Sequence, residues 1–390
     1  MADLRVLYFV EGFTDIRFVV GLSRICSLTM AVPAREYALS GLKERVSHSC
    51  TRVSVSEIAG GRIGFQWDSL RYLWRVARQF DVILAQEVLR GALNANLIGM
   101  MRHVPVVTYM GISPIEYFRC RRQRGQIGWL KSFGGETLVR MLMSANGYMA
   151  TKCLAMGPYL RDVAARYCTR SEIGLYYGVD TEFFRPADAA ERIALRRKRD
   201  LPLDKFLVFL PSRISHEKDP ETVLRAVSLA RQRGLNAVLL NLGGGYEDFL
   251  NLARQLSLPD PQTWVMGRAA VHPMTDVADY FRAADVVALA SLAEGAAFST
   301  LESLAAGTPV IATAVGGMAV QLRGYARLTP LRDPQAMAEE ILWVASNPEA
   351  ARAQAMQGRA YVLSEWSRDK AFADLRRVLE QVAKEDARWR

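Results

Sequence analysis

Two glutamates lie eight positions apart where a predicted loop runs into a predicted helix. Glu294 precedes a glycine, and Glu302 follows three residues after Ser299, which gives the spacing of a capping box. We therefore expect the helix to begin at Ser299, to run through Leu304 and to end at Gly307. Free N–H groups and the dipole at such a helix start favour an anion. A diphosphate between hydroxyl-rich groups, as in a nucleotide sugar, fits this arrangement, although the same pattern also occurs as an ordinary capping box beside a solvated loop.

A basic pair lies on a second predicted loop, after the apolar segment 206–211. Arg213 and Lys218 precede Asp219, a favourable N-cap, and Pro220, which suits the first position of a helix. The pair is therefore expected at the carboxyl end of a strand, where α/β sheets bind ligands. An arginine fork and a lysine point charge can neutralise a diphosphate without a metal, although most loop cations are simply solvated.

Other patterns exclude several kinds of site. The glycines at 243–245 follow the predicted strand 237–242 but lack the spacing of a dinucleotide fingerprint, and no P-loop motif is present. The five cysteines are scattered, odd in number and free of Cys-x-x-Cys pairs, which argues against disulfides or zinc and fits a reducing compartment. Metal-ligand spacing is also missing from the four histidines, which are His48, His103, His216 and His272. We expect no metal and no other cofactor.

The elements that position these loops form two α/β series. Apolar, β-branched or Leu-rich segments alternate with helical stretches, as parallel strands covered on both faces do. We predict helices at 70–79 and 89–101, and strands at 6–10, 81–85, 104–109, 206–211, 237–242, 263–266, 286–290 and 309–312.

Two such series predict two doubly wound, Rossmann-like domains that face a central cleft. The domains are expected at 1–180 and 181–365. Apolar residues at helical spacing over 361–383 predict a terminal helix. We assign 366–390 to this helix and expect it to pack back on the body, against the N-terminal domain.

The basic excess lies almost entirely in the first half. Residues 1–185 hold 24 Lys and Arg against 15 Asp and Glu, whereas residues 186–390 hold 26 against 25. Such an excess can mark an anionic membrane surface or a phosphorylated acceptor, and a solvated charged loop is the alternative. A nucleic-acid partner is not expected. The basic residues cluster with aromatic and apolar ones, namely Arg119, Arg121, Arg122 and Arg124 beside Tyr117, Phe118, Ile127 and Trp129.

Neither a signal peptide nor a membrane span is predicted. The start of the chain runs directly into the predicted strand 6–10, and the longest uncharged run, 303–322, is divided by glycines and a proline. We expect a cytoplasmic protein that can lie at the inner face of a membrane.

The order and spacing of these motifs over residues 177–370 resemble the retaining glycosyltransferases of the GT-B fold, of the group-one (family four) type. The matching segments, in chain order, are 177–180 with 184–186, 212–213 with 217–218, 243–245, 266–267, 284–286, 294–295 with 302–310, and 315–317.

This resemblance implies a donor site in the second domain. Arg213 and Lys218 would hold the diphosphate, Glu302 would bond the ribose hydroxyls, and Glu294 would contact the transferred sugar. The backbone at the helix start would donate hydrogen bonds from Phe298, Ser299 and Thr300. The base would lie beside Gly267 and Arg268, and Gly12 would approach the donor from a loop of the first domain.

The chain also departs from the family pattern. Met110 stands where a catalytic-site histidine is expected, and His103 lies at the other end of that predicted strand. The loop 11–15, which includes Phe13, lacks the usual paired glycines, Val320 replaces an acidic residue, and Asp219 stands where glycine is common. The donor half therefore matches the family better than the acceptor half.

The function implied is metal-independent transfer of a sugar from a nucleoside diphosphate sugar, with retention, and with Glu294, Arg213 and Lys218 as the residues that carry it. The expected acceptor is a phosphorylated or lipid-linked glycan. Two alternatives stay open. One is a catalytically weak GT-B scaffold that binds a nucleotide, which the methionine at position 110 motivates. The other is a GT-B enzyme that isomerises a nucleotide sugar.

Overall fold

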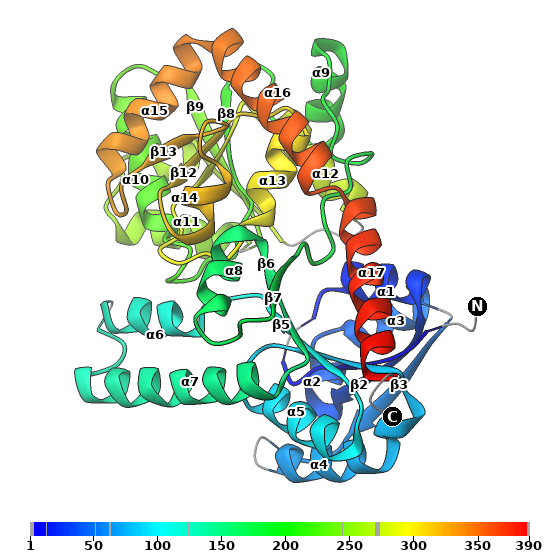
Figure 1. Ribbon diagram of the computed structural model, residues 1–390. Helices are drawn as coiled ribbons and strands as arrows, with labels where there is room; N and C mark the ends of the chain where they lie inside the picture. Colours follow the sequence, from blue (N-terminus) through cyan, green and yellow to red (C-terminus); the bar gives the residue numbers. More distant parts are fainter. Residues whose placement is uncertain are drawn as a thin grey trace. The chain divides into compact units, whose positions relative to one another are not determined.

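The computed structural model describes residues 4–12, 14–50, 52–61, 64–123, 125–243, 245–269 and 274–387. Of the residues named above, Phe13, Arg124, Gly244 and His272 lie outside these ranges. The chain divides into two compact units (Figure 1). Unit 1 comprises residues 1–178 and 369–390, and unit 2 comprises residues 179–368.

Unit 1 contains a parallel sheet that, within the described residues, has seven strands in the order β3-β2-β1-β4-β5-β6-β7. The strands are β1 (Arg5–Phe9), β2 (Ser27–Pro33), β3 (Val53–Ile58), β4 (Val82–Gln86), β5 (Val106–Met110), β6 (Lys152–Met156) and β7 (Ser171–Gly174). Its helices are α1 (Ile16–Ile25), α2 (Ala34–Leu39), α3 (Leu42–Ser49), α4 (Gly64–Val76), the short η1 (Ala77–Gln79), α5 (Arg90–Arg102), α6 (Pro114–Gln123), α7 (Trp129–Met149), α8 (Gly157–Ala165) and α17 (Arg368–Ala387).

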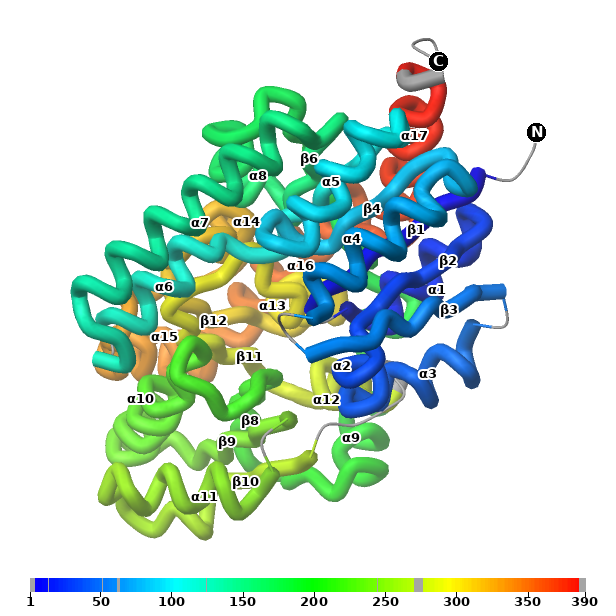
Figure 2. Tube along the Cα trace, turned by 90° about the horizontal axis from the view of Figure 1, so that it is seen from below, coloured from blue at the N-terminus to red at the C-terminus, as the bar shows by residue number. Residues whose placement is uncertain are grey.

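Unit 2 repeats this plan with a parallel sheet in which the described strands run in the order β10-β9-β8-β11-β12-β13. Figure 2 shows β10, β9, β8, β11 and β12 in that order. These are β8 (Phe206–Leu210), β9 (Ala237–Leu242), β10 (Val265–Arg268), β11 (Val286–Leu289), β12 (Val310–Thr313) and β13 (Arg327–Thr329). The helices are α9 (Ala189–Lys198), α10 (Pro220–Gln232), α11 (Tyr246–Gln255), the short η2 (Pro261–Thr263), α12 (Met274–Ala283), α13 (Phe298–Ala305), α14 (Gly316–Gln321), α15 (Pro334–Ser346) and α16 (Pro348–Glu365).

The predicted α/β class with two doubly wound sheets is confirmed. Strands β4, β9 and β11 are buried along their whole length, as expected for parallel strands that are covered on both faces. Every strand predicted above is present, with ends that move by up to two residues. Strands β2, β3, β6, β7 and β13 were not predicted.

The predicted helix over 361–383 is wrong in one respect, because it is two helices. α16 ends at Glu365, and α17 begins at Arg368. Trp366 and Ser367 form the break, where Ser367 bridges to Val179 instead of continuing the helix. The buried ring of Trp366 therefore closes the core of unit 2 and does not lie on the terminal helix.

Helix α17 belongs to unit 1. Its Phe372 ring lies directly over Gly21 of α1, where a Cβ atom would come within 1.8 Å of the ring. Phe372 also stacks on Phe18, with ring centroids 6.1 Å apart. A glycine at position 21 thus creates the space that this aromatic contact requires.

The strand order fixes where ligands can bind. In unit 1 the chain reverses direction of winding at β1, between β2 and β4, and in unit 2 it does so at β8, between β9 and β11. Crevices of doubly wound sheets form at such switch points, outside the carboxyl ends of the strands. Among the helices of the described residues, none is long and apolar enough to span a bilayer.

Candidate functional site

Lys218 and Glu294 meet at the switch point of unit 2. Lys218 lies on the loop after β8, Glu294 lies on the loop after β11, and their side chains form an ion pair. The hydroxyl of Ser291 donates a second hydrogen bond to the same Glu294 oxygen, at 3.0 Å. Only 22% of the lysine side chain and 12% of the glutamate side chain are exposed. Two predicted site residues, 76 positions apart, are therefore brought together.

The backbone ties these two loops to each other. The Leu292 N–H donates to the Glu217 carbonyl at 2.8 Å, so the residues beside Lys218 and Glu294 are linked directly. The Thr313 hydroxyl, from the end of β12, donates to the Ser291 carbonyl at 2.6 Å. The ion pair therefore rests on a hydrogen-bonded edge of the sheet.

Arg213 extends from the same edge and is largely solvent-exposed. Its guanidinium lies 3.7 Å from Glu217, and 77% of the arginine side chain is accessible. Burial alone would raise the pKa of Glu217. Hydrogen bonds to its carboxylate and the charges of Arg213 and Lys218 outweigh burial, and they hold that pKa below its usual value. Arg213 thus lies on the same loop as Lys218, with its side chain open to solvent.

The predicted capping box at the start of α13 is wrong. The helix begins at Phe298, its N-cap is Ala297, and no side chain caps it. Ser299 is therefore a helical residue, and the Thr300 N–H already donates to the Ala297 carbonyl at 3.0 Å. The boundary moves because Ala297 offers its carbonyl to the Thr300 hydroxyl as well, at 2.7 Å, which closes the first turn.

The other end of α13 is as predicted. Gly307 has a φ of +68°, which is the left-handed conformation of a helix C-cap. The Gly307 N–H donates to Leu304 at 2.9 Å and the Thr308 N–H donates to Ser303 at 3.0 Å, which is the pattern of a Schellman motif. Glu302, inside this helix, is buried, with 6% of its surface exposed.

Glycines let the neighbouring loops approach one another closely. A Cβ atom at Gly317 would lie 1.8 Å from the Gly295 carbonyl oxygen, directly after Glu294. A Cβ at Gly267 would lie 2.5 Å from the Tyr246 backbone. Arg268 ends β10 beside this contact and is partly exposed. The start of α11 therefore packs on β10, and the start of α14 packs on the loop after β11, at the carboxyl edge of the sheet.

In unit 1, Gly12 lies on the loop after β1, at the switch point of that sheet. Met110, by contrast, ends β5 inside the core, in a cluster with Val88 and Ile115. Its exposed fraction is only 1%, so the side chain at this position is packed in the core and is not open to solvent. Glu87, whose carboxyl group lies against Gly12, was not predicted as a site residue. Its place directly after a buried strand was the only sequence signal for it.

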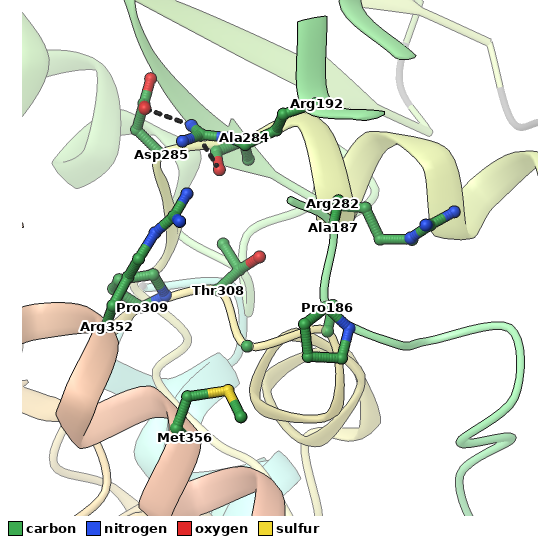
Figure 3. A pocket seen from close by; sticks show the side chains of 12 residues that line it. Pro186, Ala187, Arg192, Arg282, Ala284, Asp285, Thr308, Pro309, Arg352 and Met356 are labelled. Atoms are coloured by element: carbon green, nitrogen blue, oxygen red, sulfur yellow. Dashed lines mark hydrogen bonds and ion pairs between the residues drawn. The ribbon is translucent and has the colours of Figure 1, made fainter. Parts of the chain in front are cut away.

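A cavity of about 160 Å³ also opens in unit 2, but at the opposite edge of the sheet (Figure 3). Asp285 and Pro309, which line it, directly precede β11 and β12. Arg192 is held there by the Asp285 carboxylate and by the Ala284 carbonyl. Because ligands bind at the carboxyl ends of such strands, this cavity is not the predicted donor site.

Among the described residues, no group of three or more His, Cys, Asp or Glu side chains is placed to hold a metal ion. The cationic groups at the carboxyl edge of unit 2 are instead Arg213, Lys218 and Arg268. Their positions suit a ligand with two phosphates better than a cation.

Comparison with known proteins defines the class first. Over 97% of this chain and 100% of the other, the fold matches the crystal structure of HepE from Anabaena in complex with UDP, with a TM-score of 0.77 and 15% identity. The architecture is therefore GT-B, with two Rossmann-like domains, as the resemblance implied.

Sequence comparison matches unit 2 to a family. Residues 191–361 match the family model for "Glycosyl transferases group 1". Over 215 residues, the chain is 32% identical to a D-inositol 3-phosphate glycosyltransferase of Xylanimonas cellulosilytica. The matching segment covers 53% of this chain and 50% of that protein. A protein of the same name from Mycobacterium bovis is 36% identical over 37% of this chain and 30% of its own length. The chain thus spans about half the length, or less, of these curated relatives. Unit 2 carries a group-one glycosyltransferase domain, and the predicted resemblance is confirmed there.

Proposed function

We propose that this protein transfers a sugar from a nucleoside diphosphate sugar to an acceptor hydroxyl, with retention at the anomeric carbon and without a divalent metal. The observation that carries the proposal is the ion pair between Lys218 and Glu294 at the switch point of unit 2. In this proposal the lysine would hold the diphosphate and the carboxylate beside it would bond the sugar hydroxyls. The group-one domain over residues 191–361 supports the same donor class.

In this proposal the basic residues act on the leaving group. The bond between the anomeric carbon and the diphosphate breaks with its electron pair on the phosphate oxygen, so negative charge grows there. Lys218, aligned by Glu294, and the exposed fork of Arg213 stabilise this charge. The N-terminus of α13, eight residues long, contributes its dipole. Glu302 would hold the ribose, and Gly267 and Arg268 would lie beside the base.

The test is a donor panel. Uridine and guanosine diphosphate sugars are screened for thermal stabilisation and slow hydrolysis, and the anomeric configuration of any transferred sugar is read by NMR. UDP-glucose is the first donor to test, since HepE, which shares the fold, was crystallised with it. We expect activity in EDTA. Inverted products or a strict metal requirement would contradict the mechanism.

The catalytically weak scaffold remains a second candidate, because Met110 lies in the core where the family has a histidine. Nucleotide binding without hydrolysis or transfer from any donor would favour the scaffold.

We further propose that the α6–α7 hairpin docks on an anionic membrane. The apolar side chains of Leu130, Met141 and Tyr148 are 75%, 65% and 83% exposed. They are separated by 11 and 7 positions, close to whole numbers of helical turns, so they form one stripe along α7. Lys131 and Arg140 flank this stripe and suit acidic headgroups.

Two arginines of α6, Arg121 and Arg122, differ in their contacts. Arg122 lies 4.0 Å from Glu136, whereas Arg121 lies over the Tyr117 ring, 5.9 Å from its centroid. Liposomes with acidic lipids should retain the protein at low salt, and reversing the charge of Arg121 and Arg122 should weaken retention. Liposomes of neutral lipid are the control. Equal retention on both kinds of liposome, at any salt concentration, would contradict an electrostatic contribution.

A further inference from the structure

Unit 1 contains a cavity of about 270 Å³ at the carboxyl edge of its sheet. The loops after β1 and β4 contribute to it, and these strands flank the switch point. The ends of β2 and β3 close its other side. The chemically distinctive lining residues are Glu11, Gly12, Glu36, Phe65, Glu87 and Arg90. The cavity thus lies where a doubly wound sheet binds ligands. Gly12 is the one lining residue that the resemblance also assigns to the donor site, and none of the glutamates that line the cavity is assigned to it.

The charges that line this cavity are unbalanced. Glu11 accepts hydrogen bonds from the Gly91 N–H at 2.6 Å, from Gln66 at 2.8 Å and from Arg90 at 3.1 Å. The only arginine that lines the cavity in the described part of the chain is therefore already paired. Glu36 and Glu87 form no ion pair with described residues. Two carboxylates are left to act on whatever occupies the cavity.

Glu87 is held in an unusual conformation. Its φ is +79°, which a side chain other than glycine rarely adopts, and its N–H donates to the Tyr109 carbonyl at 2.9 Å. The turn brings its carboxyl group against Gly12, where a Cβ atom would lie 2.8 Å from the Glu87 Oε1. Backbone strain of this kind persists where the surrounding structure demands it and is concentrated at functional sites.

Burial raises the pKa of Glu87 to about 7, with a further contribution from the charge of Glu11 and opposition from Arg90. Glu36, which also faces the cavity, is exposed on the first turn of α2. The carboxyl group of Glu87 therefore changes its charge near neutral pH, unlike an ordinary glutamate.

We propose that this cavity binds an uncharged, polyhydroxylated acceptor and that the ionised carboxylate of Glu87 accepts hydrogen bonds from its hydroxyls. The identification of the ligand as an acceptor rests on the proposed function; the binding itself does not. A phosphorylated acceptor is disfavoured, because its phosphate would face two carboxylates and an arginine that is already paired. This chain would then differ in acceptor from the relatives whose name includes inositol 3-phosphate.

The experiment is calorimetric titration of the full chain with myo-inositol and inositol 3-phosphate, and with glucose and glucose 6-phosphate, without donor. We expect at least about tenfold tighter binding of one or both neutral polyols than of the matching phosphate. Between pH 6 and pH 8 the ionised fraction of Glu87 rises about tenfold, so binding of the neutral polyol should tighten by up to that factor. Binding of the phosphate should weaken over the same interval, because its second proton leaves near pH 6.

Glu87→Gln keeps the shape of the side chain and removes its charge. We expect this variant to bind neutral polyols with no dependence on pH and to discriminate less against phosphates. Glu116→Gln is the matched control, because burial also raises the pKa of Glu116 but this residue does not line the cavity. The control should keep the wild-type pH profile.

Tighter binding of the phosphorylated sugars, no binding of either neutral polyol, or an unchanged pH profile in Glu87→Gln would overturn the inference. Donor hydrolysis, measured on the same samples, keeps the two proposals apart. Hydrolysis of the donor without polyol binding would refute the proposed ligand of the cavity and leave the proposed transferase function intact. Polyol binding with the expected pH profile but without hydrolysis would support the cavity and count against the transferase.

Discussion

Replacing Glu87 with glutamine should stabilise unit 1, and the gain should grow with pH. The pKa of this glutamate is raised from 4.5 to about 7, with burial as the main cause. A group whose pKa is raised by folding contributes stability that is fully present below its unfolded pKa and is lost as the pH rises through its folded pKa. A tenfold change in proton affinity corresponds to about 1.4 kcal/mol, so the ionised side chain costs up to about 3 kcal/mol at pH 8.

At pH 5 most of this cost is absent, because the folded protein still holds the proton. The advantage of Glu87→Gln should therefore increase by about 2.5 kcal/mol between pH 5 and pH 8. In a unit of this size about 1 kcal/mol shifts the melting temperature by roughly 2–4 °C, so calorimetry of the full chain resolves the effect. Glu116→Gln, with a smaller expected change, is again the control. If the stability gained by Glu87→Gln did not change with pH, Glu87 could not be a buried carboxyl group with a raised pKa.

Three further outcomes test other contacts. Lys218→Met should lower kcat by about 10²–10³ with any active donor, whereas Lys205→Met, at a partly exposed lysine of the same unit, should not; equal rates would exclude a role for Lys218 in charge stabilisation. Gly317→Ala should abolish donor stabilisation in thermal shift, because its Cβ would lie 1.8 Å from the Gly295 carbonyl; unchanged donor binding would show that the loop after β11 does not form the site. Phe372→Ala should cost about 3–5 kcal/mol in denaturant unfolding of unit 1, and a loss below 1 kcal/mol would mean that α17 is not part of its core.

The fold could be predicted where the sequence is apolar in strand-length runs. Segment 237–242 coincides with β9, because every residue of that strand is buried on a central position of the sheet. Strand β3 was overlooked because Ser54 and Ser56 interrupt it, at the edge of the sheet where one side faces solvent. The break at Trp366 was overlooked because the apolar spacing continues across it, and only the bridge from Ser367 to Val179 distinguishes two helices from one.

The donor side of the site could be read from loops that follow strands, since parallel strands bring their carboxyl ends to one edge. That reasoning placed Lys218 at the sheet edge, the resemblance assigned Glu294 to the same site, and the two side chains do pair. It failed at the start of α13, where Ala297 and not a polar side chain takes the N-cap position. Glu87 could not be found in this way, because its positive φ and its contact with Gly12 depend on how two loops pack, which no local pattern records.

The structure favours only one of the two partners that the basic first half suggested. The excess of 24 Lys and Arg over 15 Asp and Glu suggested both an anionic surface and a phosphorylated acceptor. The cavity of unit 1 is lined by three glutamates and one paired arginine, so the positive charge of this half is not placed to hold a phosphate there. Arg121, Lys131 and Arg140 lie instead on or between the helices of the α6–α7 hairpin, beside exposed apolar side chains. Positive charge at a surface that faces acidic lipid and negative charge in a pocket that receives hydroxyls are compatible. An acceptor that is neutral where it enters the cavity therefore fits unit 1 better than one whose phosphate must be buried beside Glu87.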